Sequence, residues 1–320
     1  MKPFLSRLFL LARCLVAVGA ASLLPAFAAD DKAAISEQVD AVMNQAARAG
    51  MPVLALASTD SCTEAGPLRQ RLAGDAALRP LVARFAFVEL RMSGDDKWTW
   101  KRWQERFDTH RRQSPQLFVI RADGRKLFSG DPPADLAGVL RHQLGQVGQP
   151  LVPRQADLFE AQLRAASELQ TRGDLAGAVR SVTPACRVPS FARPVVESIA
   201  FRAAVADRML DRIERAAAEP GADTDRLAAV ELLVAAAEEF ATTLPDVART
   251  AREHVAEAGR DPAGRELVRQ AQALHHAAVA ARRSADRGLA LYEQIITTHP
   301  QSPAATLAAV RLRSLDAEPR

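Results

Sequence analysis

The residue of this sequence with the clearest chemical potential is Cys62, which lies in the segment 59–66 (Thr-Asp-Ser-Cys-Thr-Glu-Ala-Gly). An apolar run at 53–57 precedes it and a helical pattern follows it, so the sequence predicts a thiol between a strand and the N-terminus of a helix. The thiolate is the reactive form of cysteine, and a helix N-terminus stabilises it. The carboxylates of Asp60 and Glu64 oppose ionisation of the thiol. The chemistry expected of Cys62 is nucleophilic attack on a disulfide, or the retention of a partner through a mixed disulfide.

A second thiol three positions after Cys62 is missing, because that position is Ala65. Besides Cys14 and Cys62, the sequence has one further cysteine, Cys186. A neighbouring thiol attacks a mixed disulfide at an effective concentration far above that of a free thiol, so turnover of Cys62 requires an external thiol or Cys186. Three interpretations stay open: a vestigial or purely binding role for Cys62, monothiol exchange with Cys62 as the nucleophile, and a disulfide between Cys62 and Cys186 that joins two domains.

Aromatic and basic side chains gather between residues 98 and 112, where all three tryptophans occur. Aromatic residues mixed with arginines are also found in sites for single-stranded nucleic acid. Trp100, Trp103 and Phe107 are spaced by three and four residues, however, which places them on one face of a helix. We expect this face to pack against a sheet, and we expect no nucleic acid as a partner.

His275 and His276 are the adjacent histidines of the sequence. Neighbours in a helix point in different directions, and no Cys, Asp or Glu follows them at the spacing of a zinc site. We therefore expect two surface histidines and no metal site. The sequence also lacks a glycine-rich phosphate loop, and no cofactor is expected.

The first 28 residues have the pattern of a signal peptide. They contain basic residues at Lys2, Arg7 and Arg13, an apolar stretch at 8–24, and the small-x-small cleavage motif Ala26-Phe27-Ala28. Cleavage would leave a nearly neutral chain, because the leader holds three of the 42 Lys and Arg residues and none of the 38 acidic ones. We expect a periplasmic or secreted protein with no stable membrane span after cleavage, in an oxidising compartment where disulfides form.

Periodicity along the chain predicts the elements that position Cys62. In residues 29–148, helices are expected at 33–49, 67–85 (one broken helix or two short ones), 98–107 and 131–144, and strands at 52–58, 86–92, 116–122 and 125–129. The order αβαβαββα predicts an α/β domain with a central mixed sheet flanked by helices. Residues 149–154 form the expected linker, and residues 155–320 are alanine-rich and expected to be all-α.

The element order, the thiol after the second element and Ser114-Pro115 before the strand Leu117–Ile120 resemble the thioredoxin fold. The resemblance covers roughly residues 33–148. It implies that the peptide bond before Pro115 is cis, a state that is accessible at low cost before proline, and that Pro115 faces Cys62. It also implies a partner-facing surface formed by Ser61, Thr63, Ser114 and Pro115.

Three departures from the thioredoxin family accompany this resemblance. Ala65 replaces the second cysteine of the family's Cys-x-x-Cys motif, Ser61 replaces the aromatic residue before the first cysteine, and Leu56 stands where many members have a buried carboxylate. The resemblance therefore implies an accessory or binding protein for other exported or envelope proteins. The alternative is monothiol disulfide exchange, of the oxidoreductase or isomerase kind, with Cys62 as the nucleophile.

Two fragments of the helical half resemble tetratricopeptide repeats. One fragment is Leu169…Gly173-Asp174…Ala178, and the other is Tyr292…Pro300…Ala304. The resemblance implies a tetratricopeptide-like domain, in which stacked helix pairs form a concave surface that binds peptides or proteins. The alternative is a plain helical bundle that braces the first domain.

Overall fold

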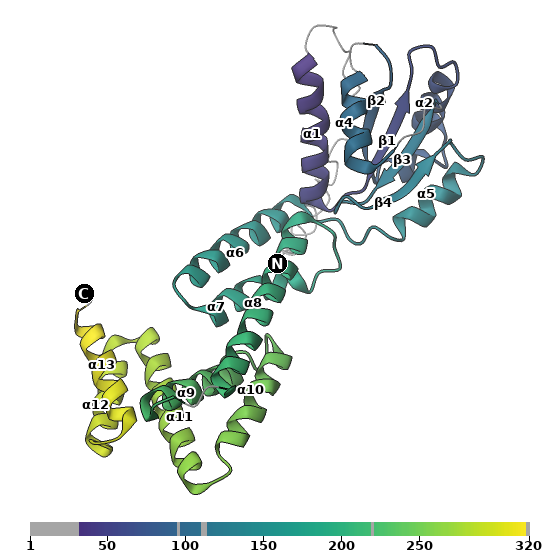
Figure 1. Cartoon of the computed structure of the whole chain (residues 1–320). Helices are drawn as coiled ribbons and strands as arrows, with labels where there is room; N and C mark the ends of the chain where they lie inside the picture. The colour runs from purple at the N-terminus through teal and green to yellow at the C-terminus, as the bar shows by residue number, and fades with distance from the viewer. Residues whose placement is uncertain (1–31, 95–96, 110–113, 219–220, 318–320) are drawn as a thin grey trace, which may run out of the picture. The chain divides into compact units, whose positions relative to one another are not determined.

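The computed structural model describes residues 32–94, 97–109, 114–218 and 221–317 (Figure 1). The expected signal peptide, residues 1–28, lies outside the described residues. The chain divides into two compact units: unit 1 comprises Met1–Ala156 and Pro189–Arg193, and unit 2 comprises Asp157–Val188 and Pro194–Arg320. Unit 1 contains a small mixed sheet with helices, and the described part of unit 2 is mostly helical. This agrees with the expected α/β region followed by a helical region.

The elements of unit 1 follow the order that the sequence predicts. The helices are α1 (Lys32–Ala49), α2 (Ala65–Gly74), α3 (Arg79–Val82), α4 (Lys97–Phe107) and α5 (Leu136–Leu144), and the strands are β1 (Val53–Ser58), β2 (Ala86–Arg91), β3 (Gln116–Ile120) and β4 (Lys126–Gly130). Of the two alternatives expected for residues 67–85, the structure has two short helices, α2 and α3. The chain turns there because the Asp75 side chain accepts hydrogen bonds from the Ala77 and Leu78 amides at 2.7 and 3.3 Å.

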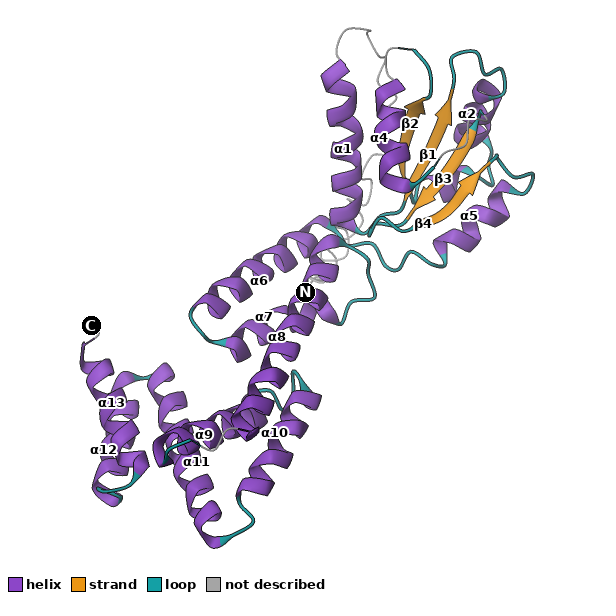
Figure 2. Cartoon of the chain, in the orientation of Figure 1, coloured by secondary structure: helices purple, strands orange, loops and turns teal. Residues whose placement is uncertain are grey.

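The four strands form one mixed sheet in the order β2-β1-β3-β4 (Figure 2). β1 pairs in parallel with β2, with Ala55 opposite Val88, and antiparallel with β3, with Ala55 opposite Phe118. β4 pairs antiparallel with β3. All six residues of β1 are buried, as expected of a central strand with an apolar sequence. The loop that carries Cys62 therefore starts from a fully buried strand.

Helices cover both faces of the sheet, because alternate residues of a strand point to opposite sides. On one face of the sheet lie α1 and α4 (Figure 2). Trp100, Trp103 and Phe107 of α4 are buried there with Phe118 and neighbouring strand residues. The expected packing of the tryptophan face on the sheet is confirmed. On the other face, α2, α3 and α5 contribute leucines such as Leu140 to a second core cluster.

A short segment from far along the chain, residues 189–193, packs within unit 1. The Gln149 amide donates a hydrogen bond to the Pro189 carbonyl at 2.8 Å. Gly50 has a φ of +73°, and a Cβ at this position would lie 2.8 Å from the Ser190 hydroxyl, so this close approach requires glycine. The first expected domain, residues 29–148, does not contain this segment. No residue pattern indicates that residues 189–193 pack against it.

Helices make up the described part of unit 2. They are α6 (Pro153–Thr171, which begins in unit 1), α7 (Leu175–Cys186), α8 (Arg193–Ala218), α9 (Asp223–Glu239), α10 (Pro245–Ala258), α11 (Pro262–Arg283), α12 (Ala285–Thr298) and α13 (Pro303–Ala317). Gly173 has a φ of +83°, and Asp174 caps α7 by accepting a hydrogen bond from the Gly177 amide at 2.7 Å. The Gly-Asp pair of the first repeat-like fragment therefore forms the turn between α6 and α7.

Two buried clusters hold the later helices of unit 2 together. One surrounds Ile213 and Phe240, and the other surrounds Leu274 and Tyr292. α9 packs against α10 and α11, and α12 packs against α11 and α13. Among residues 32–317, leaving aside the short undescribed gaps, no helix combines the length and the hydrophobicity needed to cross a membrane.

Candidate functional site at Cys62

The loop between β1 and α2 holds Cys62 in a tight turn. The Cys62 amide donates a hydrogen bond to the Thr59 carbonyl at 3.1 Å, and the Ala65 amide donates to the Cys62 carbonyl at 3.4 Å. Cys62 is partly exposed, and it lies three residues before Ala65, the first residue of α2. This is the position that the sequence predicts for the thiol, between a strand and a helix N-terminus.

Ser114 anchors this loop from the neighbouring strand. β1 and β3 run antiparallel with Ala57 opposite Gln116, so the residues after β1 and before β3 meet at one end of the sheet. The Ser114 hydroxyl accepts a hydrogen bond from the Thr59 amide at 3.1 Å, and the two hydroxyl oxygens lie 3.5 Å apart. The peptide bond between Ser114 and Pro115 is cis, as the resemblance implies.

Ser93 anchors the same loop from the other side. β1 and β2 are parallel and in register to their ends, so the segment after β2 lies beside the Cys62 loop. The Ser93 hydroxyl accepts a hydrogen bond from the Asp60 amide at 3.1 Å and donates to the Asp60 carboxylate at 3.4 Å. Gly94 has a φ of +76°, and a Cβ there would lie 3.0 Å from the carboxylate of Asp60. The loop is therefore fixed to both strands that flank β1.

The surroundings of Cys62 lower the pKa of its thiol below the ordinary value of a cysteine. The largest cause is the hydrogen bond with the Ser114 side chain, and the backbone amides of Glu64 and Ala65 act in the same direction. Partial burial and the negative charge of Glu64 act against them. The sequence predicts the opposing charge of Glu64 and the stabilising helix N-terminus. It gives no indication of the hydrogen bond from Ser114, because that contact depends on the pairing of β1 with β3.

The four residues expected to face a partner differ in exposure. Ser61 and Thr63 are exposed, Ser114 is partly exposed and Pro115 is buried. The hydroxyls of Ser61 and Thr59 lie 3.4 Å apart. Ser61 and Thr63 therefore form the accessible polar surface beside Cys62. Ser114 is less accessible and contributes through its hydrogen bond with Cys62.

Cys186 lies at the C-terminal end of α7 in unit 2, and Cys62 belongs to unit 1. Both cysteines are free thiols in the structure. Burial raises the pKa of Cys186, and the nearby positive charge of Arg202 only partly offsets this effect. At neutral pH the Cys186 thiol is therefore protonated and poorly nucleophilic. A disulfide between Cys62 and Cys186 stays a prediction.

His275 is not a surface residue, contrary to expectation. Its exposed fraction is 3%, whereas His276 is exposed as predicted. His275 Nε2 lies 3.6 Å from a carboxylate oxygen of Glu238, and Nδ1 lies 3.9 Å from one of Glu239. The prediction was wrong because burial of His275 depends on the packing of α9 against α11, which periodicity does not indicate. Among the residues that the structure describes, no group of three or more His, Cys, Asp and Glu side chains has the arrangement of a metal site.

Comparison of the chain with protein-family models and with curated proteins gives no match in either case.

Proposed function

We propose that unit 1 is a thioredoxin-like domain and that Cys62 exchanges disulfides with other exported proteins. The support comes from the mixed sheet with β1 at its centre, from the thiol that precedes α2, and from the Ser114–Pro115 segment beside it. These are the elements on which the sequence resemblance depends. The leader-like residues 1–28 support export to the periplasm or beyond.

The observation that carries this proposal is a partly exposed thiol whose pKa is lowered by Ser114 and by two backbone amides. A larger thiolate fraction at neutral pH favours nucleophilic attack. In the attack, the Cys62 thiolate forms a bond to one sulfur of a partner disulfide, and the other sulfur leaves as a thiolate. The product is a mixed disulfide between Cys62 and the partner.

The second half of the exchange needs a thiol from the partner, because Ala65 stands where a second cysteine would be. A different partner thiolate attacks the mixed disulfide, forms a new disulfide within the partner and releases Cys62 as a thiolate. The partner's disulfides are rearranged with no net oxidation or reduction. The chemistry is thus of the isomerase kind and requires no cofactor.

A second candidate is a binding role in which Cys62 does no chemistry. It is favoured by the departures from the Cys-x-x-Cys pattern and by the helix pairs α6–α7 and α12–α13, which coincide with the two repeat-like fragments. Under this proposal unit 2 is a tetratricopeptide-like interaction domain for exported or envelope proteins. A Cys62→Ser variant would then keep its partners and its function.

Alkylation of the Cys186→Ser variant separates the two candidates, because Cys62 is then the reacting thiol of the mature chain. The rate of reaction with iodoacetamide is followed by mass spectrometry as a function of pH. We expect an apparent pKa below about 8, and so below the ordinary cysteine value of about 8.5. An apparent pKa of about 8 or above, together with no mixed disulfide on incubation with scrambled ribonuclease, would remove the exchange proposal. The Cys62→Ser variant is the control for both measurements.

A further inference from the structure

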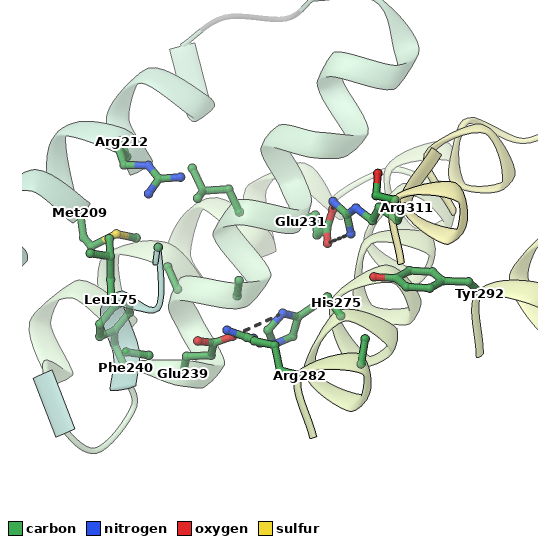
Figure 3. Close-up of a pocket in the computed structure, with 18 of the residues that line it drawn as sticks. Leu175, Met209, Arg212, Glu231, Glu239, Phe240, His275, Arg282, Tyr292 and Arg311 are labelled. Atoms are coloured by element: carbon green, nitrogen blue, oxygen red, sulfur yellow. Dashed lines mark hydrogen bonds and ion pairs between the residues drawn. The ribbon is translucent and has the colours of Figure 1, made fainter. Parts of the chain in front are cut away.

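A cavity of about 600 Å³ lies within unit 2, where residues of α7, α8, α9, α11, α12 and α13 converge (Figure 3). Its apolar wall includes Leu175, Met209 and Phe240, and alanines such as Ala235 and Ala278 leave the space between the helices open. Volumes of roughly 300–1,000 Å³ are typical of ligand sites in proteins. The cavity is therefore large enough for several side chains of a bound molecule.

Two ion pairs lie on the walls of this cavity. Arg311 donates two hydrogen bonds to the Glu231 carboxylate, at 2.5 and 2.7 Å, and Arg282 pairs with Glu239 (Figure 3). Each pair brings a positive and a negative charge together, so these four side chains leave no net charge. Burial lowers the pKa of His275, which keeps its ring neutral at neutral pH.

Arg212 on α8 carries the remaining charge. It is exposed and lines the cavity, opposite the pair of Glu231 and Arg311 (Figure 3). Among the residues that the structure describes, its guanidinium has no carboxylate or other hydrogen-bond partner. The cavity therefore combines an apolar wall with one uncompensated positive charge at its edge.

We propose that this cavity binds an acidic peptide segment of a partner protein. A carboxylate of the segment pairs with Arg212, and a large apolar side chain occupies the space over the alanines. The lining elements are helices whose backbone groups are already hydrogen-bonded internally, so recognition depends on side chains. A basic segment is disfavoured by repulsion from Arg212. This inference rests on the proposed interaction role of unit 2 and adds the chemistry of its partner.

Selection from a phage library of random dodecapeptides on the immobilised full-length protein tests the proposal. We expect enrichment of peptides in which Asp or Glu lies within a few positions of Phe, Leu or Met. A synthetic peptide of the consensus sequence is then titrated by fluorescence anisotropy. Arg212→Glu should weaken binding about tenfold or more, the effect of losing roughly 1.4 kcal/mol. Arg208→Glu, an exposed position on the same helix outside the cavity, should leave binding within about twofold of the unaltered protein.

A second pair of variants tests the cavity itself. Ala278→Leu fills part of the space and should weaken binding of the same peptide, whereas Ala273→Leu, on an exposed face of α11, should not. Circular dichroism establishes that each variant is folded.

Three outcomes of these experiments would overturn the inference. If neither Arg212→Glu nor Ala278→Leu changes the affinity for the consensus peptide, the peptide binds elsewhere. That result overturns this inference and leaves the interaction role of unit 2 standing. Enrichment of basic peptides, or no enrichment while Cys62 still forms mixed disulfides, also overturns the inference alone. No enrichment together with an unreactive Cys62 contradicts the disulfide-exchange proposal as well.

Discussion

The Ser114 hydroxyl accepts a hydrogen bond from the Thr59 amide at 3.1 Å, although 55 positions separate the two residues in the sequence. The antiparallel pairing of β1 with β3 creates this contact, because it brings the end of one strand to the start of the other. Ser114 also hydrogen-bonds Cys62 and is the main cause of its lowered pKa. One hydroxyl thus links the geometry of the sheet to the ionisation of the thiol.

Replacing Ser114 by Ala should raise the pKa of Cys62, because the thiolate loses its principal hydrogen-bond donor. A higher pKa lowers the thiolate fraction at pH 7, so we expect alkylation at that pH to slow several-fold. The measurement is the pH profile of iodoacetamide alkylation in the Cys186→Ser background. Ser114→Thr keeps a hydroxyl and should restore the profile. An Ala variant whose profile matches that of the unaltered thiol would contradict the role given to Ser114.

Much of unit 1 could be predicted from particular residues. The apolar run at 53–57 gives a buried β1, and the spacing of Trp100, Trp103 and Phe107 gives a helix that packs on the sheet. The spacing of apolar residues and the residues that form turns are local signals, so they indicate each helix or strand without reference to the rest of the chain. The position of Cys62 before α2 follows from the same signals.

The contacts that tune the site could not be predicted, because each joins segments that are distant in sequence. Ser114 reaches Thr59 through strand pairing, and Ser93 reaches Asp60 through the other neighbour of β1. Burial of His275 likewise depends on the helix that packs against it. Near Ser114 the sequence offers one signal, a serine followed by Pro115 at the start of a strand. This signal does not indicate a hydrogen bond to Cys62.

Acidification should destabilise unit 2 through His275. Burial is the largest cause of its lowered pKa; Glu239 and Glu238 oppose the shift, while His276 and Arg282 reinforce it. Below about pH 6.5 the His275 imidazole binds a proton in the unfolded chain, whereas in the folded state it stays neutral to lower pH. The unfolding free energy therefore falls as the pH drops from about 6.5 towards 5. Above that window His275 makes no pH-dependent contribution. Urea unfolding measured between these pH values checks the slope.

The matched variants for this prediction are His275→Gln and His276→Gln. The first removes the buried ring and should flatten the dependence of unfolding free energy on pH between about 5 and 6.5. The second alters an exposed ring and should leave the slope unchanged. Equal slopes in the unaltered protein and in His275→Gln would show that another group is responsible.

Breaking the Glu231–Arg311 pair should cost substantial stability. Glu231 is 10% exposed, and Arg311→Ala leaves its carboxylate buried without its bidentate partner. We expect a loss of about 3 kcal/mol in unfolding free energy, at the lower end for buried pairs because the Arg311 side chain is itself 34% exposed. Arg249→Ala removes the exposed pair with Asp246 and should cost no more than about 1 kcal/mol. Urea unfolding followed by circular dichroism compares the two, and equal losses would contradict this account.

Substitution of Gly288 by Ala should destabilise the contact between α11 and α12. A Cβ at Gly288 would lie 2.3 Å from the Cβ of Ala281 and 2.5 Å from its Cα, so the helices must separate. Overpacking of this kind costs roughly 1–3 kcal/mol, which outweighs the gain of up to about 1 kcal/mol from replacing a helical glycine. Gly66→Ala in α2 is the matched control, because nothing lies within 4 Å of the added Cβ and its effect should be neutral or stabilising. Thermal unfolding measures both, and a Gly288→Ala variant as stable as the unaltered protein would show that α11 and α12 do not approach so closely in solution.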